Sequence, residues 1–255
     1  MSLEDQSDQN HSERCFHDWM NVQELDLAEL LRALTLTDDD KPPDDQSLFA
    51  QLAEKNIEHF QEYVDKRNRL AHNDVSVYFA PTWNSALENS LLWLAGCRPS
   101  IFIRLVYALC GSQVESQIAE HLQGTRTGNL GDLSLQQLNM VNVLHCKTIK
   151  HEEKLTTQLA SLQEDIADEP ISMVAKEQSH AGDSNEVVDR ALQNHDEAMV
   201  RLLQEADNLR LTTLKELISI LTPVQAVDYL AAGRKLHLCM HEWGKKRDLK
   251  HGRGN

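Results

Sequence analysis

Glycine, proline and aromatic residues are scarce in this sequence. Its 255 residues include 10 glycines and 6 prolines, and aromatic side chains make up only 5% of the chain. β-Sandwiches and β-barrels need many tight turns, which glycine and proline favour, so their scarcity argues against those folds. Hydrophobic residues, at 41%, are still numerous enough to form a buried core. We therefore predict an all-α protein, a helical bundle of long antiparallel helices with shorter connecting helices.

Basic residues are outnumbered, and long apolar runs are missing. Lys and Arg number 25 against 40 Asp and Glu, which gives a formal net charge of −15. Because an acidic chain is repelled by phosphate backbones, we expect no direct binding to nucleic acid. No apolar run approaches the ~20 residues of a membrane helix, and the polar residues 1–11 lack the pattern of a secretory signal. We therefore expect no membrane association.

The motifs of common enzymes are also missing. The sequence has no G-x-S-x-G nucleophile elbow, no P-loop and no G-x-G-x-x-G fingerprint. Clustered carboxylates such as Asp38–Asp40 lie in a polar stretch, where nothing would raise a carboxyl pKa for acid catalysis. The five cysteines are scattered and form no C-x-x-C pair, a pattern typical of reduced thiols. These absences favour a non-catalytic intracellular protein.

The N-terminal part of the sequence divides into three segments. Residues 1–11 are polar and acidic, which predicts a disordered N-terminus. Apolar residues at helical spacing predict an amphipathic helix over 12–34. Pro42 and Pro43 then break the pattern among five aspartates, so residues 35–46 are expected to form an acidic linker.

The rest of the chain is expected to form one helical domain over 47–248 and a basic tail over 249–255. Helical patterns predict three long helices over 47–77, 134–167 and 185–221, a last helix over 223–246, and short helices over 111–122 and 171–178. Ser85 and Glu88 form a capping-box pattern, and the apolar stretch Ile101–Cys110 is expected at the centre of the core. Gly233 interrupts the last helix, which indicates a close helix contact there.

His237 and His241 are the sharpest chemical feature of the sequence. They lie four residues apart on a predicted helix, which places both imidazoles on one face. Such a pair can bind a metal ion, present a histidine to haem iron, or simply pack against the protein. A zinc site is not favoured, because Cys239 lies about 200° around the helix from His237 and no second ligand pair is evident.

Other histidines and cysteines give weaker signals. His145, Cys146 and His151 form a second cluster in the sequence. Cys146 lies among predicted core positions, whereas His151 lies in the charged run KHEEK, which predicts a solvated face. His59 and His72 have no evident partner. We expect no metal site or catalytic role for these residues.

Phe16 and Trp19 make the predicted N-terminal helix aromatic on one side. They lie in the stretch CFHDWM, ahead of the predicted linker. Two interpretations are open and do not exclude each other: the side chains dock on the bundle, or they anchor a partner protein. At the other end of the chain, Lys245–Arg253 is basic, which indicates a solvated helix end or a nuclear-import signal.

The stretch YFAPTWNSALENSLLWLAGCRPSIFIRLVYALCGSQ (Tyr78–Gln113) resembles the signature of the Delay of Germination family of plant seed-dormancy regulators. The same domain forms the C-terminal half of TGA-type bZIP transcription factors. Further similar stretches lie at 138–149, 161–171, 197–210 and 221–248, so the resemblance covers nearly the whole chain. Residues 1–46 show no basic region or leucine zipper, which separates this sequence from the TGA pattern.

The resemblance implies a regulator of dormancy and germination in abscisic-acid signalling, found in nucleus and cytoplasm. It further implies binding of clade A type 2C protein phosphatases and of haem. His237 and His241 match the family stretch K-L-H-x-x-M-H-E-W-G, so the resemblance assigns the haem iron to this pair. Asp18 and Trp19 match the end of the family's phosphatase-binding motif, and Phe16 stands where the family often has Tyr. The alternative is a transcription cofactor that acts with TGA-type factors; homo-oligomerisation is left open.

Overall fold

The computed structural model describes residues 3–35, 45–121, 130–177 and 186–253, and these residues are almost entirely helical. In these ranges the backbone forms no strand, only an isolated bridge between Trp93 and Gly96. The prediction of an all-α fold is therefore confirmed. The helices, in chain order, are α1 (Leu3–Leu34), α2 (Asp45–Leu70), α3 (Ser76–Phe79), α4 (Ala86–Asn89), α5 (Ser100–His121), η1 (Leu130–Asp132), α6 (Leu135–Glu164), η2 (Asp165–Ala167), α7 (Ile171–Glu177), α8 (Glu186–Ile220) and α9 (Pro223–Lys250).

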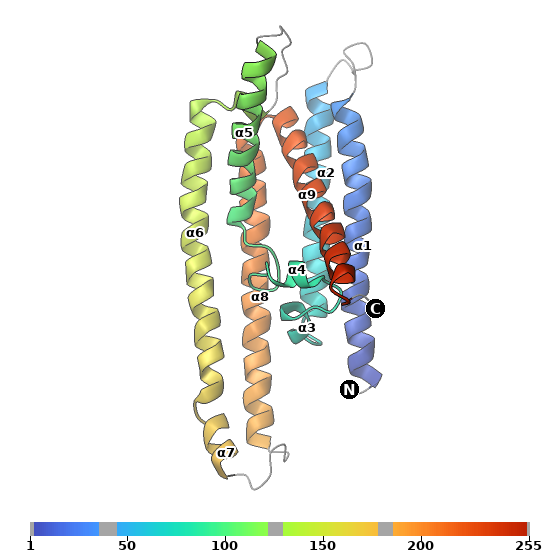
Figure 1. Cartoon of the computed structure of the whole chain (residues 1–255). Coiled ribbons are helices and arrows are strands. Elements are labelled where there is room, and N and C mark those ends of the chain that lie inside the picture. The colour runs from blue at the N-terminus through green and yellow to red at the C-terminus, as the bar shows by residue number, and fades with distance from the viewer. Residues whose placement is uncertain (1–2, 36–44, 122–129, 178–185, 254–255) are drawn as a thin grey trace.

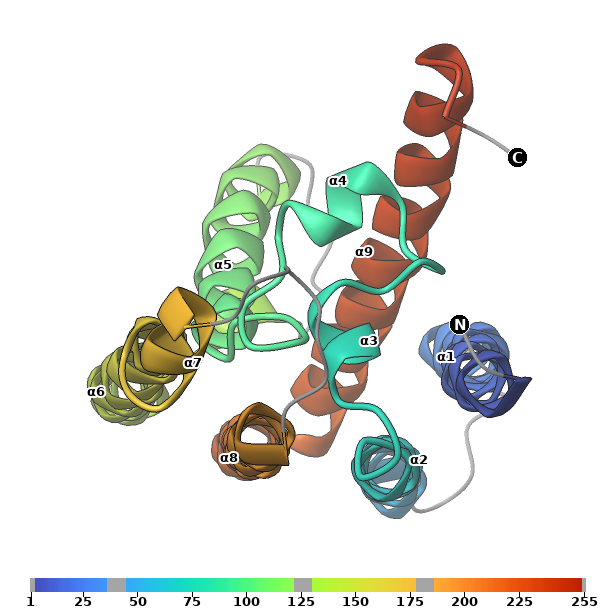
Figure 2. The ribbon, with the colours of Figure 1, turned by 90° about the horizontal axis from the view of Figure 1, so that it is seen from below.

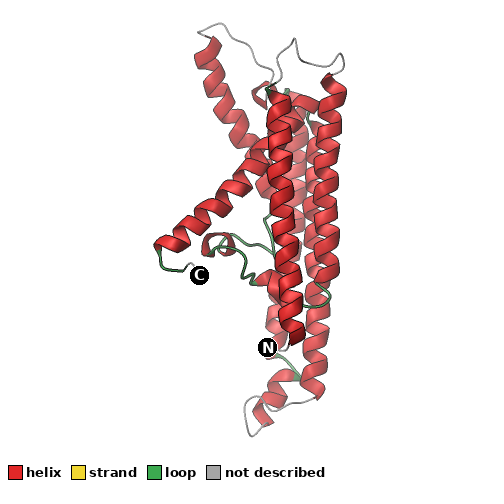
Figure 3. Cartoon of the chain, turned by 90° about the vertical axis from the view of Figure 1, so that its right-hand side faces the viewer, coloured by secondary structure: helices red, strands yellow, loops and turns green. Residues whose placement is uncertain are grey.

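The long helices lie side by side (Figure 1). α6 packs along α8, while α1 and α2 pack on each other and on α9. The short helices α3 and α4 lie between the long ones when the bundle is seen from below (Figure 2). The C-terminal half of α9 diverges from the other helices (Figure 3), and α4 contacts it. No helix in the described ranges is long and apolar enough to cross a membrane.

The main hydrophobic core lies where α1, α2, α5, α6, α8 and α9 meet. Its completely buried side chains come from all of these helices except α2, and from η1; they are Leu30, Ile103, Val106, Leu130, Val141, Leu217 and Val227. Burial of one such side chain contributes about 1.5–3 kcal/mol. α1 supplies Leu30 and Ala33 to this core, so it is an integral helix of the bundle.

Several predicted boundaries are wrong. α1 begins at Leu3, within the segment predicted to be disordered, and α2 ends at Leu70, before the separate helix α3. α5 runs through Gly111 without a break, because a helix tolerates glycine at a modest cost when its packing holds on both sides. Ile101 is 41% exposed although its neighbour Ile103 is completely buried, so only one side of this apolar stretch faces the core. The predicted linker over 35–46 lies mostly outside the described residues.

Glu152 anchors the start of α5 on α6. Its buried carboxylate accepts a hydrogen bond from the Ser100 backbone N–H at 2.6 Å and from Arg98 Nε at 2.6 Å. The first N–H groups of a helix have no partner within the helix, so this side chain from another helix supplies one. Glu152 belongs to the run KHEEK, and the solvated face predicted for that run is therefore wrong at this position.

Candidate functional site

A cavity of about 330 Å³ lies among α1, α2, α5, α8, α9 and the segment from α3 to the start of α5. Its volume falls at the lower end of the range for small-molecule and cofactor sites. Most of its wall is apolar, with several aromatic rings. The wall includes Phe16, Trp19, Phe60, Tyr63, Tyr78, Trp83, Leu91, Phe102, Leu105, Leu214, Leu230, Leu236, His237 and Met240.

Asp207 on α8 binds two arginines in the wall of this cavity. Its buried carboxylate lies 3.0 Å from Arg67 Nε and accepts a hydrogen bond from Arg210 NH1 at 2.7 Å. Two guanidinium groups therefore share one carboxylate, which leaves one excess positive charge among these three residues. This charge would favour an anionic group on a bound ligand.

Arg210 also fixes the backbone of the segment that precedes α5. It donates to the carbonyls of Trp93 (2.6 Å), Leu94 (2.9 Å) and Cys97 (2.7 Å). Leu94 and Ala95 have positive φ angles, 45° and 61°, which non-glycine residues rarely adopt. The Arg210 hydrogen bonds hold this costly conformation in place.

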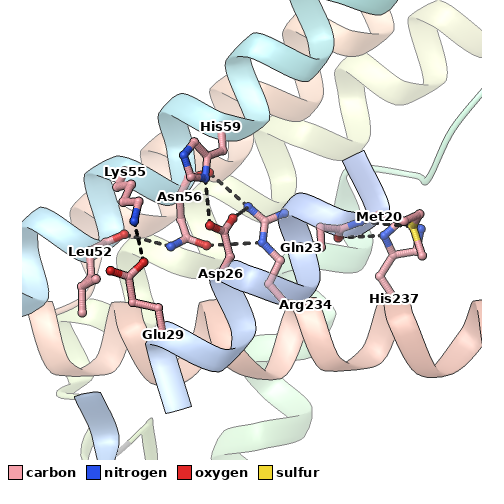
Figure 4. Close-up of polar contacts among 10 residues, drawn as sticks. All are labelled: Met20, Gln23, Asp26, Glu29, Leu52, Lys55, Asn56, His59, Arg234 and His237. Atoms are coloured by element: carbon pink, nitrogen blue, oxygen red, sulfur yellow. Dashed lines mark hydrogen bonds and ion pairs between the residues drawn. The ribbon is translucent and has the colours of Figure 1, made fainter. Parts of the chain in front are cut away.

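His237 extends from α9 into the wall of the cavity, where it is half-buried. Its Nδ1 lies 2.9 Å from Oε1 of Gln23 on α1, and the Gln23 amide nitrogen donates to Met20 Sδ at 3.3 Å (Figure 4). Burial lowers the pKa of His237 to about 4. The imidazole is therefore neutral at physiological pH.

His241 has a different environment one turn further along α9. It is 5% exposed, its Nδ1 lies 2.8 Å from Glu88 Oε1, and its ring meets Phe16 edge-on at 5.6 Å. Glu88 also accepts hydrogen bonds from the backbone N–H and hydroxyl of Ser85 at 2.8 and 2.6 Å. Burial alone would raise the pKa of Glu88, but the hydrogen bonds from His241 and Ser85 outweigh it and lower that pKa. The predicted capping box is thus confirmed, and it is tied to α9.

α1 is held against α2 and α9 by polar and aromatic contacts. Asp26 on α1 lies 3.4 Å from Arg234 of α9 and 2.8 Å from His59 of α2 (Figure 4). The Arg234 guanidinium lies over the Trp19 ring at 4.6 Å, and that ring stacks on Tyr63 at 4.8 Å. These contacts fix the wall that α1 contributes to the cavity.

The three predicted partner-binding residues have unequal exposure. Phe16 and Trp19 are only 7% and 6% exposed, so the structure places them in the bundle, as the docking interpretation predicts. Asp18 faces outward and its carboxylate lies 2.8 Å from Lys66 Nζ. Further along the same face of α1, Leu25 is 72% exposed.

Predictions for the remaining histidines and cysteines need correction. Cys146 is exposed, not buried, because it lies on the outer side of α6. His59 has Asp26 as its partner, and the His72 ring nitrogen lies 3.2 Å from the Gln204 amide nitrogen; both partners come from distant helices that sequence spacing does not reveal. Among the described residues no three His, Cys, Asp or Glu side chains gather as a metal site.

The low pKa of His237 makes stability depend on pH. The unfolded chain takes up a proton at this residue near pH 6.5, whereas the folded chain does so only near pH 4. The free energy of unfolding should therefore fall between about pH 6.5 and pH 4, by at most about 1.4 kcal/mol per pH unit from this residue. Urea unfolding at about pH 7.5 and pH 5 should show a smaller drop for His237→Ala than for the wild type. Equal drops would contradict the assignment.

Comparisons with known proteins identify the family of this chain. The family model described as DOG1, seed dormancy control, matches residues 26–108. Protein DOG1-like 1 of Arabidopsis thaliana is 46% identical over 92% of this chain and 89% of its own length, and DOG1-like 3 is 42% identical over 92% and 84%.

More distant relatives from the same plant include Protein RESPONSE TO ABA AND SALT 1, which is 25% identical over 79% of this chain and 80% of its own. Transcription factor TGA2 is 27% identical over 68% of this chain and 47% of its own length. The similarity to the DOG1-like proteins extends over most of both chains, far beyond the residues matched by the family model. The chain therefore belongs to the DOG1 family of seed-dormancy-control proteins, as the resemblance of Tyr78–Gln113 predicts.

Proposed function

We propose that this chain is a non-enzymatic regulator of seed dormancy and germination in abscisic-acid signalling. It acts by binding and restraining a clade A type 2C protein phosphatase, and it binds haem. Family membership supports the role in dormancy, and the relative named for its response to ABA and salt supports the hormone pathway. The observation that carries the proposal is the cavity behind α1, with His237 in its wall.

The residues of the cavity fit a haem group in three respects. The wall is mainly apolar and aromatic, which suits a porphyrin face, and the excess charge of Arg67, Asp207 and Arg210 suits the carboxylates of a porphyrin. His237 is neutral, the form in which imidazole binds metals. When bound, haem would supply an iron centre that accepts axial ligands and changes its oxidation state. The chain would supply the imidazole, the apolar enclosure and the counter-charge.

The phosphatase is proposed to contact the outward face of α1. Phe16 and Trp19 hold this helix on the bundle, so the surface left for a partner is the side that carries Asp18 and Leu25. These two residues are seven positions apart and therefore share one face of the helix. An exposed leucine beside charged side chains is a suitable anchor for a partner protein.

Calorimetric titration with a type 2C phosphatase tests this assignment. Leu25→Asp should weaken binding at least about tenfold, because it places a charge where an apolar contact is proposed. Circular dichroism should show unchanged helicity, since Leu25 is exposed. Leu249→Asp, at a similarly exposed leucine near the end of α9, is the matched control and should leave the affinity unchanged. Wild-type affinity in Leu25→Asp, or no binding by the wild type, would contradict the proposal.

A second candidate function is that of a transcription cofactor. The similarity to Transcription factor TGA2 favours it, because a shared domain can pair with its relative. The chain would then reach DNA through a TGA-type factor rather than by direct contact. A gel-shift experiment distinguishes the two functions: the chain alone should not shift duplex DNA at physiological salt, and a supershift of a TGA-bound duplex would favour the cofactor.

The proposed location is the nucleus and the cytoplasm. Lys245, Lys246, Arg247 and Lys250 are exposed at the end of α9, where an import receptor has access to them. A fluorescent fusion should enter the nucleus, and replacement of these four residues by Gln should reduce the nuclear fraction. Equal nuclear fractions for the wild type and this variant would show that the basic cluster is not the import signal.

A further inference from the structure

The two histidines of α9 are not equivalent with respect to the cavity. His237 is part of the cavity wall and is half-buried, so a ligand in the cavity has access to its ring. His241 is not among the residues that form the wall. It is 5% exposed and is packed between Phe16 and Glu88.

Gln23 determines which nitrogen of His237 is available. Its amide nitrogen donates to Met20 Sδ at 3.3 Å, which directs its carbonyl oxygen to His237 Nδ1 at 2.9 Å. A carbonyl oxygen only accepts hydrogen bonds, so Nδ1 carries the proton and the lone pair resides on Nε2. Gln23 is buried, so water does not replace it in this role. Histidines that bind metals characteristically donate their second N–H to an oxygen in this way.

His241 is committed to the attachment of α4. Glu88 Oε1 accepts from His241, while Glu88 Oε2 accepts from the Ser85 backbone and hydroxyl. One carboxylate therefore joins the N-terminus of α4 to the last turns of α9. Removal of His241 would weaken this connection between α4 and α9. Glu88 is also part of the cavity wall.

We infer that His237 is the residue of α9 that binds the iron of a haem in this cavity, that Gln23 is its positioning residue, and that His241 holds α4 in place without binding the metal. This inference rests on the proposed binding of haem, and it deepens that proposal by dividing the roles within the histidine pair. The geometry that carries it is the Gln23–His237 hydrogen bond at the cavity wall together with the Glu88–His241 bond away from it.

Haemin titration of single variants, followed by absorbance, tests the division of roles. His237→Ala should lose the shifted Soret band of the wild type and regain it on addition of imidazole, which fills the vacated space as a replacement ligand. His241→Gln, which retains an N–H donor for Glu88, should keep the wild-type band at saturating haemin. A band lost in His241→Gln but kept in His237→Ala would overturn the inference. No saturable band in the wild type would overturn haem binding itself and the inference with it.

Resonance Raman spectra of the reduced haem complex test the role of Gln23. Gln23→Glu should raise the iron–histidine stretching frequency, because a carboxylate increases the basicity of the imidazole, and Gln23→Leu should lower it. Opposite shifts at unchanged helicity are not expected from a merely structural residue. Identical frequencies in the wild type and both variants would show that Gln23 does not position the ligand.

Discussion

Asp207→Ala should lower the free energy of unfolding by about 3–5 kcal/mol, the range for breaking a buried ion pair. The carboxylate is buried between Arg67 and Arg210, which are themselves buried. Its removal leaves two buried guanidinium groups without a counter-charge. Arg210 also holds the positive-φ segment at Leu94 and Ala95, so that segment should loosen as well. Urea unfolding followed by circular dichroism measures the loss.

The matched control for this prediction is another carboxylate on α8. Glu197 lies 3.8 Å from Arg201, and both side chains are mostly exposed. Exposed pairs of this kind contribute about 0–1 kcal/mol, so Glu197→Ala should change stability by less than about 1 kcal/mol. Comparable losses of stability in the two variants would show that Asp207 contributes no more than a surface charge. That result would contradict its role as the shared counter-charge of the two arginines.

Gly244→Ala should destabilise the protein and disconnect α4 from α9. A Cβ atom at this position would stand 1.9 Å from Ser85 Oγ and 2.7 Å from Ser85 Cβ, so the start of α4 has to move. That movement breaks the hydrogen bonds between Glu88, Ser85 and His241. We expect a loss of about 1–3 kcal/mol, as for other cases of overpacking, measured by urea unfolding.

Gly233→Ala on the same helix is the control with the opposite sign. The nearest atom to its Cβ would be Leu105 Cδ2 at 3.8 Å, an ordinary contact. Alanine favours a helix over glycine by about 1 kcal/mol, so this variant should be more stable than the wild type. If Gly244→Ala is as stable as the wild type or more stable, the close contact with Ser85 does not exist in solution. The sequence-based prediction of a close contact at Gly233 is therefore wrong: the close contact on α9 is at Gly244, about three helical turns further along.

The fold is predictable from the sequence where local signals are strong. The starts of α4 and α9 are examples. Ser85 with Glu88 caps α4, and Thr222 with Pro223 begins α9, by local interactions that need no distant partner. The start of α1 at Leu3 is not predictable in this way, because residues 3–11 are mostly polar. Their helix is continuous with the amphipathic segment that docks on the bundle. Tertiary packing of the rest of α1 decides the outcome.

The site is predictable only in part. The spacing of His237 and His241 reveals the pair, but Gln23 lies 214 positions from His237 and carries no local signal. Glu88 is visible as a capping residue, whereas its bond to His241 is not, because the pattern S-x-x-E is complete without it. Asp207 and Arg210 are visible as an i,i+3 pair on a predicted helix, but Arg67, 140 positions earlier, becomes a neighbour of Asp207 only after folding.

Haemin titration of the wild type and of the His237→Ala/His241→Ala double variant tests the central claim most directly. We expect a saturable Soret band in the wild type that the double variant loses, at equal helicity by circular dichroism. The control is the exposed variant Leu25→Asp, which should retain the band. A Soret band of equal intensity and affinity in the double variant would contradict the claim that the cavity beside α9 holds the haem.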